Sequence, residues 1–357
     1  MKITEEKLGE HERVAFISDA GSGLEAIIAV HSTALGPAAG GCRVWAYASQ
    51  QDALGDVLKL SQGMSYKNAM AGLHLGGGKA VILGPIDEAK RRDVFRAFGA
   101  AVEMLGGAYI TAEDVGVRVA DMQAVAEKTA FVTGVTAAKG IGGDPSPYTA
   151  RGVLQGIKAA VRHKFGHDDL SGLRIAVQGL GNVGGNLCQL LAQEDAKLFI
   201  TDIDTARVAA IRARTGASLF ALDALNMLQA DVFAPCALGG VVTEHFAQTV
   251  NVPIIAGGAN NQLLTPAAGD ILHARRILYA PDYVINAGGI VVVDAEYRGD
   301  SDIDGILSKV DAIGARVSQL FDESEHADQP TYVLADQAAR AKISAAQHAA
   351  KALEAAQ

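Results

Sequence analysis

The 357-residue sequence has little of what marks secreted or membrane-bound proteins. It has three cysteines, Cys42, Cys188 and Cys236, which lie far apart and form neither a metal-type pair nor an even disulfide set. No run reaches about 18 uninterrupted apolar residues, which argues against a membrane span. The N-terminus also lacks the apolar core of a secretory signal. We therefore expect a cytoplasmic protein without a membrane partner.

The sequence also lacks an excess of basic residues. Its formal net charge is −9, which disfavours nucleic acid as a partner. Hydrophobic residues make up 49% and charged residues 20%, a balance typical of a packed globular core. The length favours two domains. No internal repeat or low-complexity segment is present.

A glycine-rich stretch stands at the midpoint of the chain, between an apolar run and a helical stretch: Val177-Gln178-Gly179-Leu180-Gly181-Asn182-Val183-Gly184. Gly179 would permit a tight turn, Gly181 would let the backbone approach a pyrophosphate, and Gly184 would let helix and strand pack closely. The helix N-terminus would attract the phosphates. A second apolar run ends at Asp202, which would accept hydrogen bonds from a ribose. A mere glycine-rich turn is the alternative, but the strand–turn–helix–strand context favours a dinucleotide site.

The first part of the chain alternates between strand and helix patterns. The predicted elements are strands at 13–18 and 24–31, a loop at 35–43, a helix at 51–71, a strand at 79–83, a helix at 88–105 and a strand at 108–112. The loop at 35–43 has too little side chain to belong to a core. These elements predict an α/β domain.

Three charged residues of this part are candidates for chemistry. Lys67 and Lys79 each border apolar sequence, so one cleft could hold both. An exposed lysine after a flexible loop is the alternative for Lys79. Asp114 follows a strand, where catalytic carboxylates often lie in α/β sheets. A helix cap or a turn is equally compatible with that position.

The second part continues the alternation. A segment at 134–149, rich in glycine and proline, predicts an interdomain linker. The elements predicted after it are a helix at 149–163, strands at 174–177, 197–201, 232–236, 253–261 and 277–282, a helix opening at 290–294, and an alanine-rich helix from about 330. This order predicts a doubly wound sheet.

Several motifs, in order along the chain, resemble one enzyme family. They are Leu35 to Arg43, Met64 to Lys79, Thr111 to Gly116, the glycine stretch at 179–184, Ala234 to Ala237, Ala259 to Asn261 and Tyr279 to Gly289. Together they resemble the amino-acid dehydrogenases that act on glutamate, leucine, valine, phenylalanine or tryptophan. The likeness extends from about residue 12 to 345 and looks closest to the branch for hydrophobic amino acids. One departure is His74, where the family usually carries proline.

The resemblance implies a fold and a reaction. The fold would be α/β with two domains and a cleft between them: a substrate and oligomerisation domain at 1–138, joined by the helix at about 330–357, and a Rossmann-type NAD-binding domain at 139–329. The reaction would be the reversible oxidative deamination of an L-amino acid by NAD to a 2-oxo acid, ammonia and NADH. The protein would be a homo-oligomer. It would need no metal.

The resemblance also implies roles for single residues. Lys67 would bind the substrate carboxylate, Lys79 would activate water, and Asp114 would exchange the amine proton. Further substrate-binding residues would be Ala39, Gly40, Gly41, Met64, Ala112, Asn260, Ile290 and Val293. The cofactor would be bound by Thr149, Gly179, Gly181, Asn182, Val183, Gly184, Asp202, Ala237 and Asn260.

Two residues bear on specificity. Ala39 stands where glutamate enzymes carry a lysine, which disfavours glutamate because a buried carboxylate would lack a partner. Alanine also leaves room for an aromatic side chain, although the branched Ile290 and Val293 narrow the same pocket. Asp202 favours NAD over NADP because its charge would repel a 2′-phosphate; Arg207 could offset this. A leucine or valine dehydrogenase and a non-catalytic NAD-binding protein remain alternatives.

Overall fold

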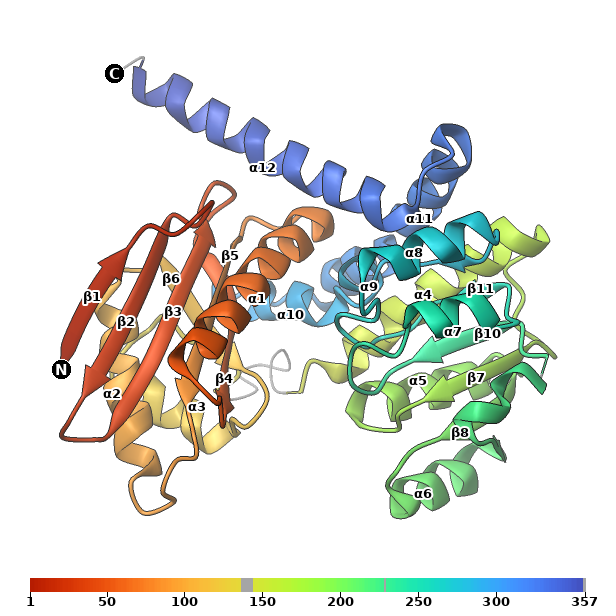
Figure 1. Cartoon of the computed structure of the whole chain (residues 1–357), viewed down its shortest axis with the longest axis horizontal. Helices are drawn as coiled ribbons and strands as arrows, with labels where there is room; N and C mark the ends of the chain where they lie inside the picture. Colours follow the sequence, from red (N-terminus) through yellow and green to blue (C-terminus); the bar gives the residue numbers. More distant parts are fainter. Residues whose placement is uncertain (136–143, 228, 356–357) are drawn as a thin grey trace. The chain divides into compact units, whose positions relative to one another are not determined.

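Two compact units make up the chain in the computed structural model, which describes residues 1–135, 144–227 and 229–355 (Figure 1). Unit 1 comprises Met1–Asp144, Val293–Ser301 and Ala339–Gln357, and unit 2 comprises Pro145–Val292 and Asp302–Ala338. The predicted two-domain α/β fold is confirmed. Of the predicted linker at 134–149, residues 136–143 lie outside the described part of the chain.

Unit 1 is built on a six-stranded sheet with the order β1-β2-β3-β5-β4-β6. Its strands are β1 (Lys2–Glu6), β2 (Arg13–Asp19), β3 (Leu24–Ser32), β4 (Ala38–Trp45), β5 (Gly76–Leu83) and β6 (Tyr109–Glu113). Its helices include α1 (Gln50–Ala71), α2 (Arg91–Met104) and α3 (Val119–Ala126). Strands β1, β2, β3 and β5 pair antiparallel, whereas β4 is parallel to both β5 and β6.

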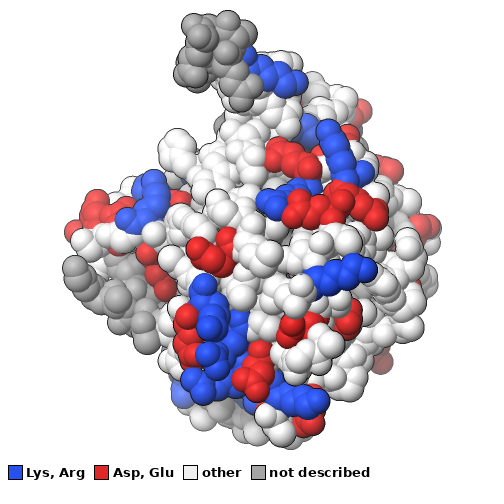
Figure 2. All heavy atoms as spheres, turned by 90° about the vertical axis from the view of Figure 1, so that its left-hand side faces the viewer, with Lys and Arg blue, Asp and Glu red and all other residues white. Residues whose placement is uncertain are grey.

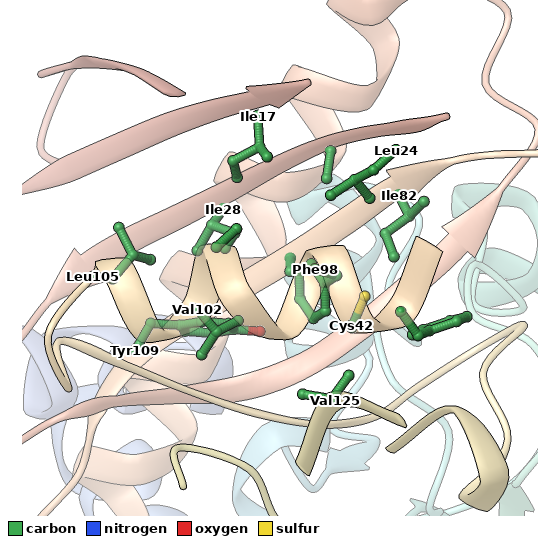
Figure 3. Close-up of a cluster of buried hydrophobic side chains, with 14 of the residues drawn as sticks. Ile17, Leu24, Ile28, Cys42, Ile82, Phe98, Val102, Leu105, Tyr109 and Val125 are labelled. Atoms are coloured by element: carbon green, nitrogen blue, oxygen red, sulfur yellow. The ribbon is translucent and has the colours of Figure 1, made fainter. Parts of the chain in front are cut away.

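Both faces of this sheet are covered. Strand side chains alternate between the faces, so Ile28 of β3 joins a cluster with α2 while its neighbour Ile27 joins a cluster with α1. Figure 3 shows Phe98 and Val102 of α2 beside strand residues such as Ile28 and Ile82. The sheet is therefore the middle of three layers.

The predicted loop at 35–43, expected to lie outside the core, is wrong because most of this segment belongs to strand β4. Ala38–Trp45 is an interior strand of the sheet, and Cys42 is fully buried in the cluster of Figure 3. A Cβ added to Gly40 would lie 1.8 Å from the carbonyl oxygen of Gly78 on β5. The small residues therefore reflect close backbone packing rather than a surface loop.

Helix α1 has clear signals at both ends. The Ser49 side chain accepts a hydrogen bond from the Asp52 amide at the N-terminus, as a helix cap does. Gly72 ends the helix with a φ of 70°, the left-handed conformation that glycine adopts without strain. These ends fix the length of the helix that carries Met64 and Lys67.

Unit 2 has a second six-stranded sheet, entirely parallel, with the order β12-β11-β10-β7-β8-β9. Its strands are β7 (Arg174–Gln178), β8 (Lys197–Thr201), β9 (Ser218–Leu219), β10 (Val232–Pro235), β11 (Ile254–Ile255) and β12 (Leu278–Tyr279). Its helices are α4 (Ser146–Phe165), α5 (Asn182–Gln193), α6 (Thr205–Thr215), a 3₁₀ turn η1 (Leu222–Met227), α7 (Glu244–Thr249), α8 (Pro266–Ala274), α9 (Asp282–Ile285) and α11 (Ile303–Ala327). The predicted doubly wound sheet is confirmed.

Two further helices contribute residues to both units: α10 (Gly288–Arg298) and α12 (Thr331–Ala355). Both were expected, as a helix opening at 290–294 and an alanine-rich helix from about 330. No helix within the described residues is long and apolar enough to span a bilayer.

Charged side chains of both signs lie next to one another on the face shown in Figure 2. The ion pairs of unit 1 include Arg92 with Glu127 and Arg118 with Glu88, at 2.7 and 2.9 Å. Exposed pairs of this kind contribute little to stability, so the packed layers carry most of it.

Candidate functional site

Lys79 lies on β5 directly after three glycines. A Cβ on Gly77 would lie 2.1 Å from the Ser65 backbone nitrogen on α1, and one on Gly78 would lie 2.7 Å from the Tyr109 ring. The glycines therefore belong to the strand and let it pack tightly against its neighbours. As a result Lys79 is only 6% exposed, which excludes the surface-lysine alternative.

Asp114 follows the last residue of β6, and its Oδ2 accepts a hydrogen bond from Lys79 Nζ at 2.6 Å. Strand β4 lies between β5 and β6, so this contact passes over β4. A Cβ on Gly41 of β4 would lie 2.8 Å from the Asp114 Cβ. Gly41 therefore leaves the space in which the lysine and the aspartate approach each other.

The ionisation of Asp114 follows from its neighbours. Burial by itself would raise the pKa of Asp114, but the charge and hydrogen bond of Lys79, together with the charge of Arg43, outweigh burial and hold the pKa below its ordinary value. The pair is thus a buried lysine beside an ionised carboxylate, two groups that can pass a proton to each other or to a ligand.

The other residues expected at the substrate site in unit 1 cluster around this pair. Gly41 pairs with Ala112 in the β4–β6 register, and Ala39 pairs with Gly77 in the β4–β5 register. The β4–β5 ladder skips Gly40 and Gly41 and resumes at Cys42. The structure therefore brings Ala39, Gly40, Gly41 and Ala112 together with Lys79 and Asp114.

Helix α1 brings two more of these residues to the sheet. The Met64 Cγ lies 3.3 Å from the position of a Cβ on Gly40. Lys67, one helical turn further along α1, is partly exposed. Its assignment to the substrate carboxylate stays a prediction.

Arg43 is a residue that the sequence reasoning did not single out. Its Nε donates to Asp114 Oδ2 at 3.1 Å, and its Nη1 donates to Asp56 Oδ2 of α1 at 3.0 Å. Asp56 Oδ2 also accepts a hydrogen bond of 2.6 Å from the Tyr47 hydroxyl. Strand alternation gives a signal for Arg43, because Gly41 and Arg43 are two residues apart on β4 and share a face. That signal applies only where this segment is a strand, and the sequence predicts a loop there.

In unit 2 the glycine stretch has the expected backbone geometry. Gly179 has a φ of 89°, and a Cβ on it would lie 2.5 Å from the Ala237 nitrogen. A Cβ on Gly184 would lie 1.9 Å from the Gly179 carbonyl oxygen, so helix and turn are in close contact. At Gly181 the nearest atom is Arg207 Nη1 at 3.8 Å, which leaves room beside the backbone. The tight turn and the close packing are confirmed; contact with a cofactor stays a prediction.

Asp202 lies beside this turn. It follows β8, and its carboxylate accepts hydrogen bonds from the amides of Leu180 at 2.5 Å and Asp204 at 2.8 Å. Asn182 and Val183 open α5, where the first amides of a helix have no partner within the helix. An acid, a glycine turn and a helix N-terminus thus meet as a dinucleotide site requires.

Three further residues of unit 2 were expected to bind the cofactor. Ala237 contacts Gly179, whereas Asn260 is exposed and its Oδ1 accepts a 2.8 Å hydrogen bond from Asn286. Thr149 donates to the Pro145 carbonyl at 3.2 Å near the start of α4.

Ile290 and Val293, expected as walls of one substrate pocket, lie three residues apart on α10 and are both partly exposed. Ile290 belongs to unit 2 and Val293 to unit 1. Their assignment to a common pocket stays a prediction. Within the described parts of the chain, no group of three or more histidine, cysteine, aspartate or glutamate residues could hold a metal ion.

Comparison with known proteins agrees with this arrangement. Residues 11–131 match the profile of the Glu/Leu/Phe/Val dehydrogenase dimerisation domain, and residues 201–352 match that of the glutamate/leucine/phenylalanine/valine dehydrogenases. The chain is 46% identical over 334 residues to leucine dehydrogenase of Geobacillus stearothermophilus, covering 94% of this chain and 91% of the relative. It is 44% identical over 325 residues to phenylalanine dehydrogenase of Bacillus thermotolerans, covering 90% and 85%.

A solved structure gives the same result. The crystal structure of L-tryptophan dehydrogenase from Nostoc punctiforme superposes with a TM-score of 0.82 at 37% identity, covering 95% of this chain and 97% of that one. The predicted resemblance is confirmed. With both profiles matched along most of its length and Lys79 paired with Asp114 in its first unit, the chain belongs to the Glu/Leu/Phe/Val family of amino-acid dehydrogenases.

Proposed function

We propose that the protein catalyses the reversible, NAD-dependent oxidative deamination of a hydrophobic L-amino acid to the 2-oxo acid, ammonia and NADH. The observation that supports this most strongly is the contact of buried Lys79 with half-buried Asp114, 2.6 Å apart, beside two glycines whose pairing with β5 is interrupted. Family membership makes the chain an amino-acid dehydrogenase. The pair provides the groups that such a reaction needs for proton transfer.

In this proposal Lys67 and the backbone amides at Gly40 and Gly41 bind the substrate α-carboxylate. A bound nicotinamide would supply the acceptor for the hydride of the substrate Cα. Lys79 Nζ takes a proton from the water that attacks the resulting imine carbon, and Asp114 transfers protons to and from the substrate nitrogen. Because both groups are partly shielded from bulk water, their charges act on the substrate with little screening.

The substrate class follows from the surroundings of this pair. Ala39 is 2% exposed and presents only a methyl group, so a glutamate side chain would find no cation at that position. Its small size leaves room for an aromatic side chain, which we favour. A branched-chain substrate is the second candidate, because relatives with 46% and 42% identity are a leucine dehydrogenase and a valine dehydrogenase.

The choice of cofactor rests on the glycine turn and Asp202. The carboxylate is held beside the turn by two backbone amides, where it would bind the adenosine ribose and repel a 2′-phosphate. Arg207 lies near Gly181 and also pairs with Asp204 at 3.2 Å, so its charge is partly compensated. We propose NAD as the cofactor. We also propose a homo-oligomer, because residues 11–131 match a profile described as a dimerisation domain.

A substrate panel tests the proposal. Initial rates of reduced-nicotinamide formation are measured with phenylalanine, tryptophan, leucine, valine and glutamate, each with NAD and with NADP. We expect activity with NAD on the hydrophobic amino acids, highest with an aromatic one, and none on glutamate. A higher kcat/KM with leucine or valine would establish the branched-chain alternative, and a preference for NADP would refute the role given to Asp202. Absence of turnover with every L-amino acid would support a non-catalytic nucleotide-binding protein.

A further inference from the structure

Arg43 joins the catalytic pair to helix α1. Its guanidinium bridges two carboxylates, with Nε 3.1 Å from Asp114 Oδ2 and Nη1 3.0 Å from Asp56 Oδ2. Arg43 and Asp114 each keep only 24% of their side-chain surface exposed, and Asp56 keeps 29%. An arginine held at two points in this way has little freedom to move.

The bridge is anchored on its far side. The Tyr47 hydroxyl donates to the same Asp56 oxygen at 2.6 Å. Burial followed by the hydrogen bond to Asp56 raises the pKa of Tyr47, so the phenol remains a donor. A continuous chain of polar contacts therefore runs from Lys79 through Asp114, Arg43 and Asp56 to Tyr47.

Two cations share one oxygen of Asp114. Lys79 reaches Oδ2 from β5, and Arg43 reaches it from β4. Asp56 on α1 is a carboxylate on the far side of Arg43. Of the two cations, the lysine must lose its proton to act as a base, whereas a guanidinium stays charged throughout the accessible pH range. When Lys79 becomes neutral, the charge on Arg43 still opposes protonation of Asp114, together with the backbone hydrogen bond from Val115.

We propose that Arg43 is a positioning residue for the amino-acid dehydrogenase reaction: it holds Asp114 in place and keeps it ionised during the part of the cycle in which Lys79 has given up its proton. Asp56 and Tyr47 fix the guanidinium in turn. This inference rests on the proposed function, because that function gives Asp114 its role in proton transfer. It adds a third group, whose charge does not change, that favours the ionised form of Asp114 in both protonation states of Lys79.

The test compares Arg43→Gln, Arg43→Lys and Asp56→Asn with the wild-type chain. Arg92→Gln is the control, since Arg92 is an exposed arginine of unit 1 paired with Glu127. Each variant is checked by thermal melting, and kcat and KM for the amino acid are measured against pH with NAD. The titration of the Asp114 carboxyl is followed independently by carbon-13 NMR of labelled aspartate, with Asp114→Asn used to assign the signal.

We expect Arg43→Gln to lower kcat about 10- to 100-fold with a smaller change in KM, because the displaced carboxylate transfers protons poorly. Loss of the positive charge raises the pKa of Asp114, so the acidic limb of kcat/KM and the NMR titration both move to higher pH, by about one unit. Arg43→Lys keeps the charge and leaves the limb near its wild-type position, but recovers only part of kcat because an ammonium cannot bridge both carboxylates. Asp56→Asn lowers kcat but does not move the acidic limb of kcat/KM to higher pH.

The outcomes separate the two proposals. A wild-type protein that turns over no amino acid overturns the proposed function, while the NMR titration still tests the effect of Arg43 on Asp114. An Asp114 titration that is the same in Arg43→Gln and the wild type overturns the inference, whatever the activity. So does an Arg43→Gln enzyme with wild-type kcat and an unmoved acidic limb. If Arg43→Gln fails to fold, Arg43→Lys and Asp56→Asn decide through kcat, and wild-type kcat in both variants overturns the inference.

Discussion

Lys79 is the residue on which the proposed chemistry depends most directly. It is 6% exposed, and its Nζ lies 2.6 Å from Asp114 Oδ2. We expect Lys79→Ala to lower kcat by about 10²- to 10⁴-fold, the usual contribution of a general acid–base group. The affinity for NADH should stay within about two-fold, because the glycine turn belongs to unit 2. The measurement is steady-state kinetics together with fluorescence titration of NADH.

Lys59→Ala is the matched control, since Lys59 is an exposed lysine of α1 in the same unit. It should keep wild-type kcat. A Lys79→Ala enzyme as active as this control would remove Lys79 from the mechanism.

At the scale of single residues, the sequence allowed Lys79 and Asp114 to be singled out separately but not their contact. The two are 35 positions apart, and they meet because β4 lies between β5 and β6 with Gly41 at the crossing point. The contacts of Arg43 are not visible in the sequence for the same reason. Its partners come from β6 and α1, and no local pattern encodes that combination.

Among the elements, β4 shows why a strand made of small residues is hard to predict from the sequence. Strands are usually recognised from branched and aromatic side chains, and Ala38-Ala39-Gly40-Gly41 has none. The structure uses their small size to bring three strands and α1 close together. Long amphipathic or apolar stretches, such as α2 and β3, were predictable because their own residues carry the burial signal.

The packing of β4 gives a prediction on stability. A methyl group at Gly40 would lie 1.8 Å from a backbone oxygen of β5, and a backbone atom cannot move aside like the end of a side chain. Gly40→Ala should therefore lower the free energy of unfolding by at least about 2 kcal/mol. Trp45, the single tryptophan of the chain, ends β4 and reports on unit 1 by fluorescence during urea unfolding.

Gly55→Ala provides the comparison for the same substitution. Gly55 lies within α1, and beyond its chain neighbours and the nearby backbone of this helix no atom lies within 4 Å of an added Cβ. There alanine should stabilise unit 1 by about 0.5–1 kcal/mol through helix propensity. Equal stability of Gly40→Ala and Gly55→Ala would show that the close approach at β4 carries no cost.

On the scale of the whole molecule, the two-domain α/β architecture could be predicted because strand and helix patterns alternate in both parts of the sequence. The glycine stretch with its flanking strands specifies the parallel sheet of unit 2. The mixed sheet of unit 1 depends on pairings between distant segments, and its order, with β5 between β3 and β4, is not encoded in any one of them. The segments α10 and α12 return residues to unit 1 from the end of the chain, a connection that only the fold reveals.

The dependence of stability on pH is also a property of the whole chain, since several groups titrate differently when it unfolds. His31 is 6% exposed, and its Nδ1 is 2.8 Å from Ser65 Oγ on α1. Burial first, and then the neighbouring His11, lower the pKa of His31 from 6.5 to about 4. Asp19 and Asp114 have pKa values below the ordinary value of 3.8, so their contribution to stability is lost only at lower pH.

The direction of the pKa shift of His31 determines the pH range over which this residue changes the stability. The unfolded chain takes up a proton at His31 near pH 6.5 while the folded chain does not, so stability is highest above pH 6.5 and falls as the pH drops toward 4. We expect His31 to account for a loss of about 2–3 kcal/mol across that range.

Urea unfolding followed by Trp45 fluorescence at pH 7.0, 6.0, 5.0 and 4.5 measures the slope of the free energy of unfolding against pH. His31→Asn, which removes the titrating ring, should flatten it, whereas His74→Gln, at an exposed histidine of the same unit, should leave it unchanged. A slope that is identical in all three proteins would mean that other groups, among them His11, set the acid sensitivity of unit 1.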